Sequence, residues 1–127
     1  NNVYAFCIPI PPDRENYSNI SIEFYYSDKS LKKIKNNKCL YFDNEIDELY
    51  NKSTNKTEIR KLESVRTENE YNKKIFYKDI GNEDWIHSKA KFADLIESDD
   101  EFIKDIDFNN FNIIFEKIIK IINETIQ

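Results

Sequence analysis

The C-terminal part of the chain repeats large apolar residues at helical spacing, and this repeat constrains the fold more than any other feature. It predicts a helix of roughly five turns with one apolar stripe. Asp107 stands directly before the stripe, where an aspartate can cap the helix. Because soluble monomers rarely expose large apolar patches, we expect this stripe to pack on the sheet of the same domain rather than on a partner helix. The stripe comprises Phe108, Phe111, Phe115, Ile118 and Ile122, and Ile114 and Ile121 widen it.

The N-terminal part predicts a strand. Residues 3–10 form a continuous apolar run that ends at Pro11 and Pro12, which is typical of a strand buried on both faces of an α/β sheet. Because the run begins within two residues of Asn1 and the chain has no Met, we expect a fragment of a larger protein. The expected fold class is α/β: a small sheet with a buried N-terminal strand, short helices, and the long amphipathic C-terminal helix packed on it.

Length and composition favour one folded domain over residues 1–127. The chain is long enough to bury a core, and nine Phe and eight Tyr supply the apolar area for it. Its net charge of −5 argues against a broad electropositive surface for nonspecific binding to phosphates. A local basic patch is still compatible with this charge.

Serine and aspartate residues mark the starts of further helices. Ser21 can cap a short helix over residues 22–26, although a strand is the main competing interpretation there. Ser27 or Asp28 can cap a second helix that extends to Ile34. Ser88 can cap a third helix, and Asp99 or Asp100 a fourth over residues 101–104. In the third helix Phe92, Leu95 and Ile96 share one face.

The middle of the chain is less regular. Residues 39–42 and 71–77 are short apolar stretches that predict strands, and a turn is expected at Gly81 and Asn82. Between them, residues 43–70 are too polar to be buried, so we expect a mobile polar loop there.

The two cysteines and the absence of targeting signals predict a cytoplasmic protein. Cys7 and Cys39 lie in apolar surroundings, as small buried hydrophobic residues do, and a disulfide between them is not favoured. The sequence has no signal peptide and no apolar run near 18 residues, so we expect neither a membrane span nor binding to a membrane.

Several common catalytic and binding motifs are excluded. A glycine-rich phosphate loop cannot form, because Gly81 is the only glycine. His87 is the only histidine, so a zinc site would need distant cysteines and carboxylates. His87 could act as a general base, but a role in packing explains it more simply. The acidic residues 97–101 lack the spacing of a calcium loop and are expected to form a solvated turn that includes a helix cap.

Glu23 and Lys89 are the candidate site residues. Glu23 lies among apolar and aromatic residues, where an unpaired carboxylate is costly to bury, so it must face water, pair with a lysine or serve a functional role. Lys89 and Lys91 lie in the first turn of a predicted helix, where cations are mildly unfavourable and anions are favoured. Lys89 and the first-turn amides could together hold a phosphate. The alternative is a solvated pair of lysines.

Five short stretches together resemble the C-terminal part of TOPRIM-like domains. Such domains occur in bacterial phage-defence proteins, including nucleases related to the overcoming-lysogenisation-defect family and proteins associated with retrons. The stretches span most of the chain, and each is short: residues 4–11, 20–26, 40–42, 88–93 and 107–111.

The resemblance implies part of a metal-dependent nuclease-type protein that processes nucleic acid. In that family an upstream Glu and an Asp-x-Asp element bind a divalent cation such as Mg²⁺, and neither element is present here. Only Glu23 and Lys89 carry over as catalytic residues, Glu23 as an acidic metal ligand and Lys89 as a residue facing phosphate. The resemblance thus implies that this chain alone is inactive and binds no cofactor, and that nucleic acid binds through the parent protein.

Two other functions remain open from the sequence. An acidic interaction domain, such as an immunity or sensor module, would bind a basic protein partner without catalysis. An assembly domain would use the C-terminal stripe as the seam of a homo-oligomer.

Overall fold

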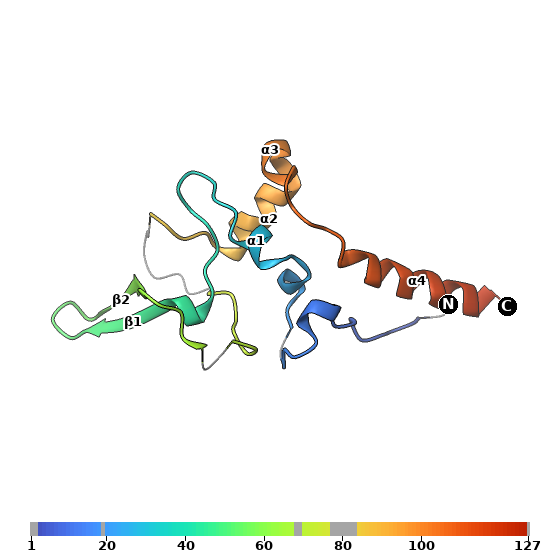
Figure 1. Cartoon of the computed structure of the whole chain (residues 1–127), viewed down its shortest axis with the longest axis horizontal. Helices are drawn as coiled ribbons and strands as arrows, with labels where there is room; N and C mark the ends of the chain where they lie inside the picture. The colour runs from blue at the N-terminus through green and yellow to red at the C-terminus, as the bar shows by residue number, and fades with distance from the viewer. Residues whose placement is uncertain (1–2, 19, 68–69, 77–83, 127) are drawn as a thin grey trace.

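A computed structural model describes residues 3–18, 20–67, 70–76 and 84–126 and shows a mixed α/β fold (Figure 1). The predicted class is confirmed. The strands are β1 (Ile46–Asn51) and β2 (Lys56–Lys61), and the helices are α1 (Asp28–Leu31), α2 (Lys89–Ser98), α3 (Asp100–Ile103) and α4 (Phe111–Ile126). Three short 3-10 helices complete the described elements: η1 (Pro12–Arg14), η2 (Ile22–Tyr25) and η3 (Asp43–Glu45).

The small sheet is an antiparallel hairpin of β1 and β2, in which Ile46 pairs with Lys61 and Asn51 with Lys56. It lies within residues 43–70, for which the sequence predicted a polar loop. That prediction considered burial alone, but an exposed two-stranded ribbon needs little buried surface. Its register is supported by polar cross-strand contacts such as the ion pair between Asp47 and Arg60, 2.9 Å apart.

The prediction of a buried N-terminal strand is wrong. Residues 3–10 are extended, but no described strand pairs with them, and Val3 is 91% exposed. Cys7, expected to be buried, is exposed, whereas Cys39 is buried as predicted. The apolar pattern correctly indicates a segment suited to burial. A strand also needs a partner edge, and the sheet formed by the described residues is a hairpin at the other end of the molecule (Figure 1).

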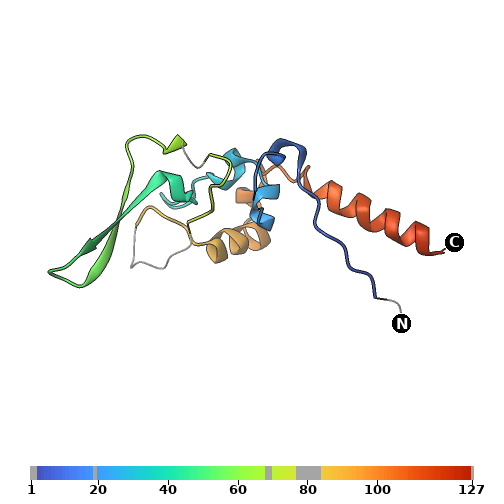
Figure 2. The same cartoon turned by 90° about the horizontal axis from the view of Figure 1, so that it is seen from below.

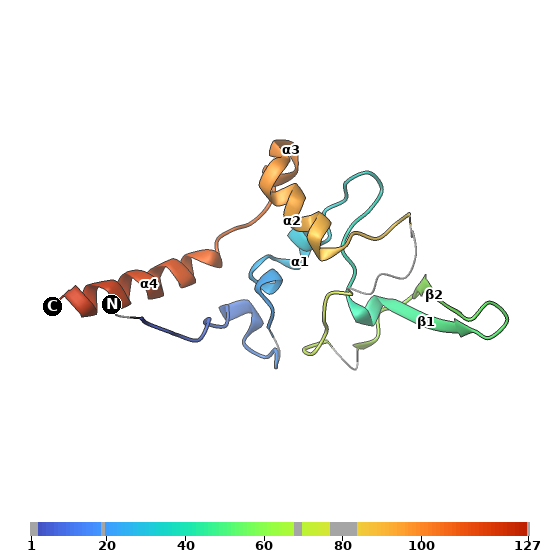
Figure 3. The same ribbon diagram turned by 180° about the vertical axis from the view of Figure 1, so that it is seen from behind.

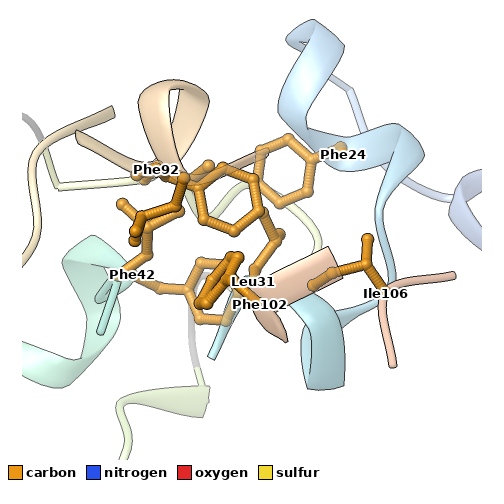
Figure 4. Packing of buried hydrophobic residues seen from close by; sticks show 9 residues of the cluster. Phe24, Leu31, Phe42, Phe92, Phe102 and Ile106 are labelled. Carbon is orange, nitrogen blue, oxygen red and sulfur yellow. The ribbon is translucent and has the colours of Figure 1, made fainter. Parts of the chain in front are cut away.

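The core forms where several short elements converge. Phe24 stacks on Phe42 with ring centroids 6.1 Å apart, and Phe92 meets Phe102 edge to face at 5.9 Å. Figure 4 shows these side chains together with Leu31 in one cluster. The remaining buried members are Leu40, Ile75, Leu95 and Ile106.

Helix starts follow the predicted caps in three cases. The hydroxyl of Ser27 accepts from the backbone N–H of Ser30 at 3.1 Å, and that of Ser88 accepts from Lys91 N–H at 3.0 Å. A carboxylate oxygen of Asp99 accepts from the N–H of Phe102 at 3.0 Å and so caps α3. Residues 22–25 are helical, as predicted for residues 22–26, but the helix is a 3-10 helix and the Ser21 side chain does not cap it.

Two predicted strands are reduced to single bridges. Cys39 forms a parallel bridge with Ile86, and Phe42 forms an antiparallel bridge with Ile75. Since neither bridge is extended into a ladder, these segments connect the core without adding to the sheet. The expected turn at residues 81–82 lies outside the described residues.

The long helix α4 is present, but the prediction that it packs on the sheet is wrong. Figures 1 and 3 show α4 and the hairpin at opposite ends of the molecule, and Figure 2 shows the same separation from below. Asp107 does not cap α4, since its carboxylate accepts from Asn109 N–H in a turn and the helix begins at Phe111. The helix is held at its first residue, where Phe111 packs on Tyr25 and Tyr26 with centroids 5.3 and 4.9 Å away.

Candidate functional site

The structure brings Glu23 and Lys89 together. Glu23 belongs to η2, and Lys89 is the first residue of α2, whose start is fixed by the Ser88 cap. The Lys89 Nζ lies 3.4 Å from the Glu23 Oε1, and the two side chains are 37% and 20% exposed. The pairing of Glu23 with a lysine, one of the alternatives that the sequence left open, is the one observed.

The environment of Glu23 favours its charged form. Burial alone would raise the pKa of the carboxyl, but hydrogen bonds with Ser21 and the backbone, together with the Lys89 ammonium, outweigh burial and lower it. Glu23 is therefore a carboxylate at neutral pH. The Glu23 carboxylate and the Lys89 ammonium therefore form an ion pair with no net charge.

The described residues contain no cluster of metal-ligating side chains. A hard divalent cation takes six or more oxygen ligands, several of them from carboxylates in a protein-only site. Over residues 3–18, 20–67, 70–76 and 84–126, no three His, Cys, Asp or Glu side chains are placed to share a metal ion. In the acidic run, Asp99 caps α3 and lies 2.9 Å from Lys35 Nζ, as expected for a structural turn. A metal bound at Glu23 would need its other ligands from further residues or from water.

A second charged cluster, which the sequence did not predict, surrounds Arg14. The guanidinium of this buried residue lies 2.7 Å from Asp28 Oδ1. It also donates to the carbonyl oxygens of Phe24 and Tyr26 at 3.3 and 2.9 Å, and to the Tyr17 hydroxyl at 2.9 Å. Arg14 thereby joins η1, η2 and the start of α1.

Lys73 completes this cluster from a distant part of the chain. Its Nζ lies 2.9 Å from Asp28 Oδ2 and 4.3 Å from the centroid of the Phe42 ring. Burial alone would raise the pKa of Asp28, but its bonds to Lys73 and Arg14 outweigh burial and lower it. Two buried cations thus share one carboxylate. We call Arg14, Asp28 and Lys73 the buried charge cluster and assign it to stability.

His87 has the structural role that the sequence favoured. It is 3% exposed, and neither ring nitrogen has a hydrogen-bond partner among the described residues. Burial lowers the pKa of the imidazole from its ordinary 6.5, and the nearby Lys38 and Lys91 lower it further. The ring is therefore neutral at pH 7 and packs in the interior.

The free energy of unfolding is expected to fall as pH decreases below about 6.5. A histidine whose pKa is lowered by folding binds its proton more readily in the unfolded chain, so acid favours unfolding. Urea unfolding between pH 7.5 and 5 measures the slope of the free energy of unfolding against pH. This slope corresponds to the uptake of about one proton at most on unfolding. The variant His87→Gln should be less sensitive to pH over this window. An equal slope in both proteins would contradict the assignment.

Comparisons with protein-family models, with curated proteins and with solved structures find no match to this chain. Among the described residues, no helix has the length and apolar character needed to cross a membrane.

Proposed function

We propose that the chain is an assembly domain that joins two copies of itself through α4. The observation that carries this proposal is the exposed apolar side of this helix. Its four large residues are between 48% and 78% exposed, and at 3.6 residues per turn they lie side by side along one face. These residues, which we call the α4 seam, are Phe115, Ile119, Ile122 and Ile126.

The other half of the apolar stripe is partly covered. Phe111, Ile114, Ile118 and Ile121 are half-buried. Lys117, which belongs to α4, donates from its Nζ to the carbonyl oxygen of Cys7 at 3.2 Å. The extended N-terminal segment therefore reaches this helix. Contacts within this chain therefore cover part of the stripe and leave the α4 seam to a partner.

The cost of leaving the seam in water supports a partner. Full burial of one Phe or Ile side chain is worth about 1.5–3 kcal/mol relative to exposure. Four such side chains in one row form an apolar patch of the kind that marks interaction sites in soluble proteins.

Spacing and charge favour a second copy of the chain as the partner. The seam residues follow one another at intervals of four, three and four, which is the repeat of helices that pack along each other. Within α4, Glu116 and Glu124 are balanced by Lys117 and Lys120, so the net charge of −5 lies outside the helix. Two α4 helices can therefore meet without net repulsion between them.

Sedimentation velocity tests this proposal. The account expects a species of twice 15.3 kDa that dissociates on dilution and changes little with salt, because the contact is apolar. A mass of 15.3 kDa at all concentrations up to about 100 µM would contradict it, since a specific dimer contact would be populated there.

A second candidate function is a part in nucleic-acid processing, as the TOPRIM-like resemblance implies. The observation that favours it is the contact between Glu23 and Lys89, which are far apart in the sequence and are the two residues that carry over. In this proposal Lys89 faces a phosphate from the first turn of α2, and Glu23 holds the lysine until phosphate binds. The metal ligands of the active site would come from other residues.

Calorimetry with inorganic pyrophosphate tests the second candidate. Replacing Glu23→Gln frees the Lys89 ammonium and is expected to tighten binding several-fold, whereas Lys89→Gln should weaken it by a similar factor. The exposed Lys104→Gln serves as the matched control. Equal pyrophosphate affinity of the Lys89→Gln and Lys104→Gln variants would exclude the proposed role of Lys89.

A further inference from the structure

The single tryptophan of the chain belongs to a partly exposed aromatic pair surrounded by lysines. Trp85 and Tyr41 meet edge to face, with ring centroids 4.8 Å apart and ring planes at 90°. Both rings are half-buried. Backbone hydrogen bonds hold their positions: Cys39 N–H donates to the Trp85 carbonyl at 3.4 Å, and Phe76 N–H donates to the Tyr41 carbonyl at 2.8 Å.

Two lysines lie over these rings, and they differ in whether a carboxylate holds them in place. Lys32 Nζ is 3.8 Å from the Tyr41 centroid and is fixed by both carboxylate oxygens of Glu45, at 2.7 and 2.9 Å. Lys61, the last residue of β2, is exposed, and its Nζ lies 4.8 Å from the Trp85 centroid and 5.3 Å from that of Tyr41. No carboxylate among the described residues pairs with Lys61.

Further positive charge lies close by. Lys38 directly precedes Cys39, whose backbone bonds to Trp85, and Lys38 and Lys91 are both close enough to His87 to lower the pKa of its imidazole. In a chain of net charge −5, Lys32 and Lys61 thus lie over the half-buried aromatic pair, and Lys38 and Lys91 lie near the neighbouring His87. The sequence left such a local basic patch open.

We propose that Tyr41 and Trp85 form a stacking site for the bases of a single-stranded nucleic acid, and that Lys61 contacts its phosphates. Aromatic rings bordered by cations are the elements that bind single strands without sequence preference, because every base has a face that can stack. In a duplex the bases are already stacked inside, so a duplex is a poorer ligand. An acidic peptide would meet the lysines but has no base for the rings.

The relative strengths of the contacts allow a base to displace Lys61 from Trp85. A cation over a ring at an exposed site is worth about two- to fivefold in an equilibrium constant. Stacking of one base on an aromatic side chain is worth about five- to 150-fold. The displaced ammonium then remains within reach of the adjoining phosphate. This inference goes beyond both proposed functions, since it involves neither the α4 seam nor the pair Glu23 and Lys89.

The fluorescence of Trp85 tests the proposal directly, because no other tryptophan contributes to the signal. Titration of the full chain with a thymidine oligonucleotide is expected to quench this fluorescence, and the quenching should weaken as salt is raised. The variant Tyr41→Leu should bind about five- to 150-fold more weakly, while Tyr41→Phe restores affinity. Circular dichroism of each variant shows whether it is folded.

Lys61→Gln keeps the test sharp even if Tyr41→Leu fails to fold, since Lys61 is exposed. It should lower the slope of log affinity against log salt by about 1, whereas Lys104→Gln, which alters a lysine paired with Glu101, should leave the slope unchanged. Three outcomes would overturn the proposal: equal quenching by polyglutamate, equal affinity for a duplex of the same length, or identical salt slopes for Lys61→Gln and Lys104→Gln.

Discussion

Asp28→Asn is expected to reduce the free energy of unfolding by about 3 kcal/mol. The change removes the charge that two buried cations share, Arg14 at 2.7 Å and Lys73 at 2.9 Å, and breaking a buried ion pair costs about 3–5 kcal/mol. We expect the lower end of this range because the Asp28 side chain is 46% exposed and water can replace part of the lost interaction. Urea unfolding followed by circular dichroism measures the effect.

Asp47→Asn is the matched control for this variant. Asp47 also pairs with two cations, Arg60 at 2.9 Å and Arg66 at 3.0 Å, but these arginines are exposed. The same substitution there should leave the urea midpoint nearly unchanged, because exposed ion pairs contribute little. Similar midpoints for the Asp28 and Asp47 variants would show that burial of the charge cluster does not stabilise this fold.

Acid provides a second measurement on the buried charge cluster. Folding lowers the pKa of Asp28 below its ordinary 3.8, so the stability that its charge contributes is present above this pH. It is lost as pH falls through the lower pKa of the folded state. The decrease in the free energy of unfolding below about pH 4 should be smaller in Asp28→Asn than in the wild type.

Ile122→Asp is expected to convert the proposed dimer into a folded monomer. Residue 122 lies in the α4 seam, and each dimer contains two copies of it, so a cost of about 2 kcal/mol per site weakens association by about 1,000-fold. Because Ile122 is 48% exposed in a single chain, its replacement should leave the monomer folded. Light scattering gives the mass, and circular dichroism gives the helix content.

Asn123→Asp places the same charge one residue further along α4, on its polar side. It should leave the dimer intact, which separates the effect of position from that of charge. Ile118→Asp, on the half-buried side of the stripe, should disturb contacts within the chain as well. Dissociation of both Ile122→Asp and Asn123→Asp to the same extent would contradict the assignment of the seam.

Local sequence signals predicted three of the helix starts, whereas the caps expected at Ser21 and Asp107 are not formed. Ser27, Ser88 and Asp99 cap helices because the side chain and the amide that it accepts from are only three residues apart. The helical repeat of α4 was equally readable, since it depends on neighbouring turns alone. Neither signal indicates which element packs against the apolar face of α4. The prediction that α4 packs on the sheet was wrong for this reason.

Partners distant in sequence were harder to predict. Residues 3–10 have the composition of a buried strand, but pairing depends on an edge that the described part of this chain does not offer. The pairing of Glu23 with a lysine was an alternative because an unpaired carboxylate is costly among apolar residues. Arg14 and Lys73 gave no comparable warning: Arg14 lies in a polar stretch that predicts exposure, and Lys73 is one of two adjacent lysines within the short apolar stretch of residues 71–77. A possible signal was the spacing of three between Arg14 and Tyr17, whose side chains are hydrogen-bonded in the fold.

The most direct test of the proposed assembly is hydrogen exchange at two protein concentrations about a hundredfold apart, because dimer formation protects only amides at the contact. The account predicts slower exchange in Phe111–Ile126 at the higher concentration, with unchanged exchange in the hairpin of Ile46–Asn51 and Lys56–Lys61. Exchange in α4 that does not depend on concentration would contradict assembly through this helix.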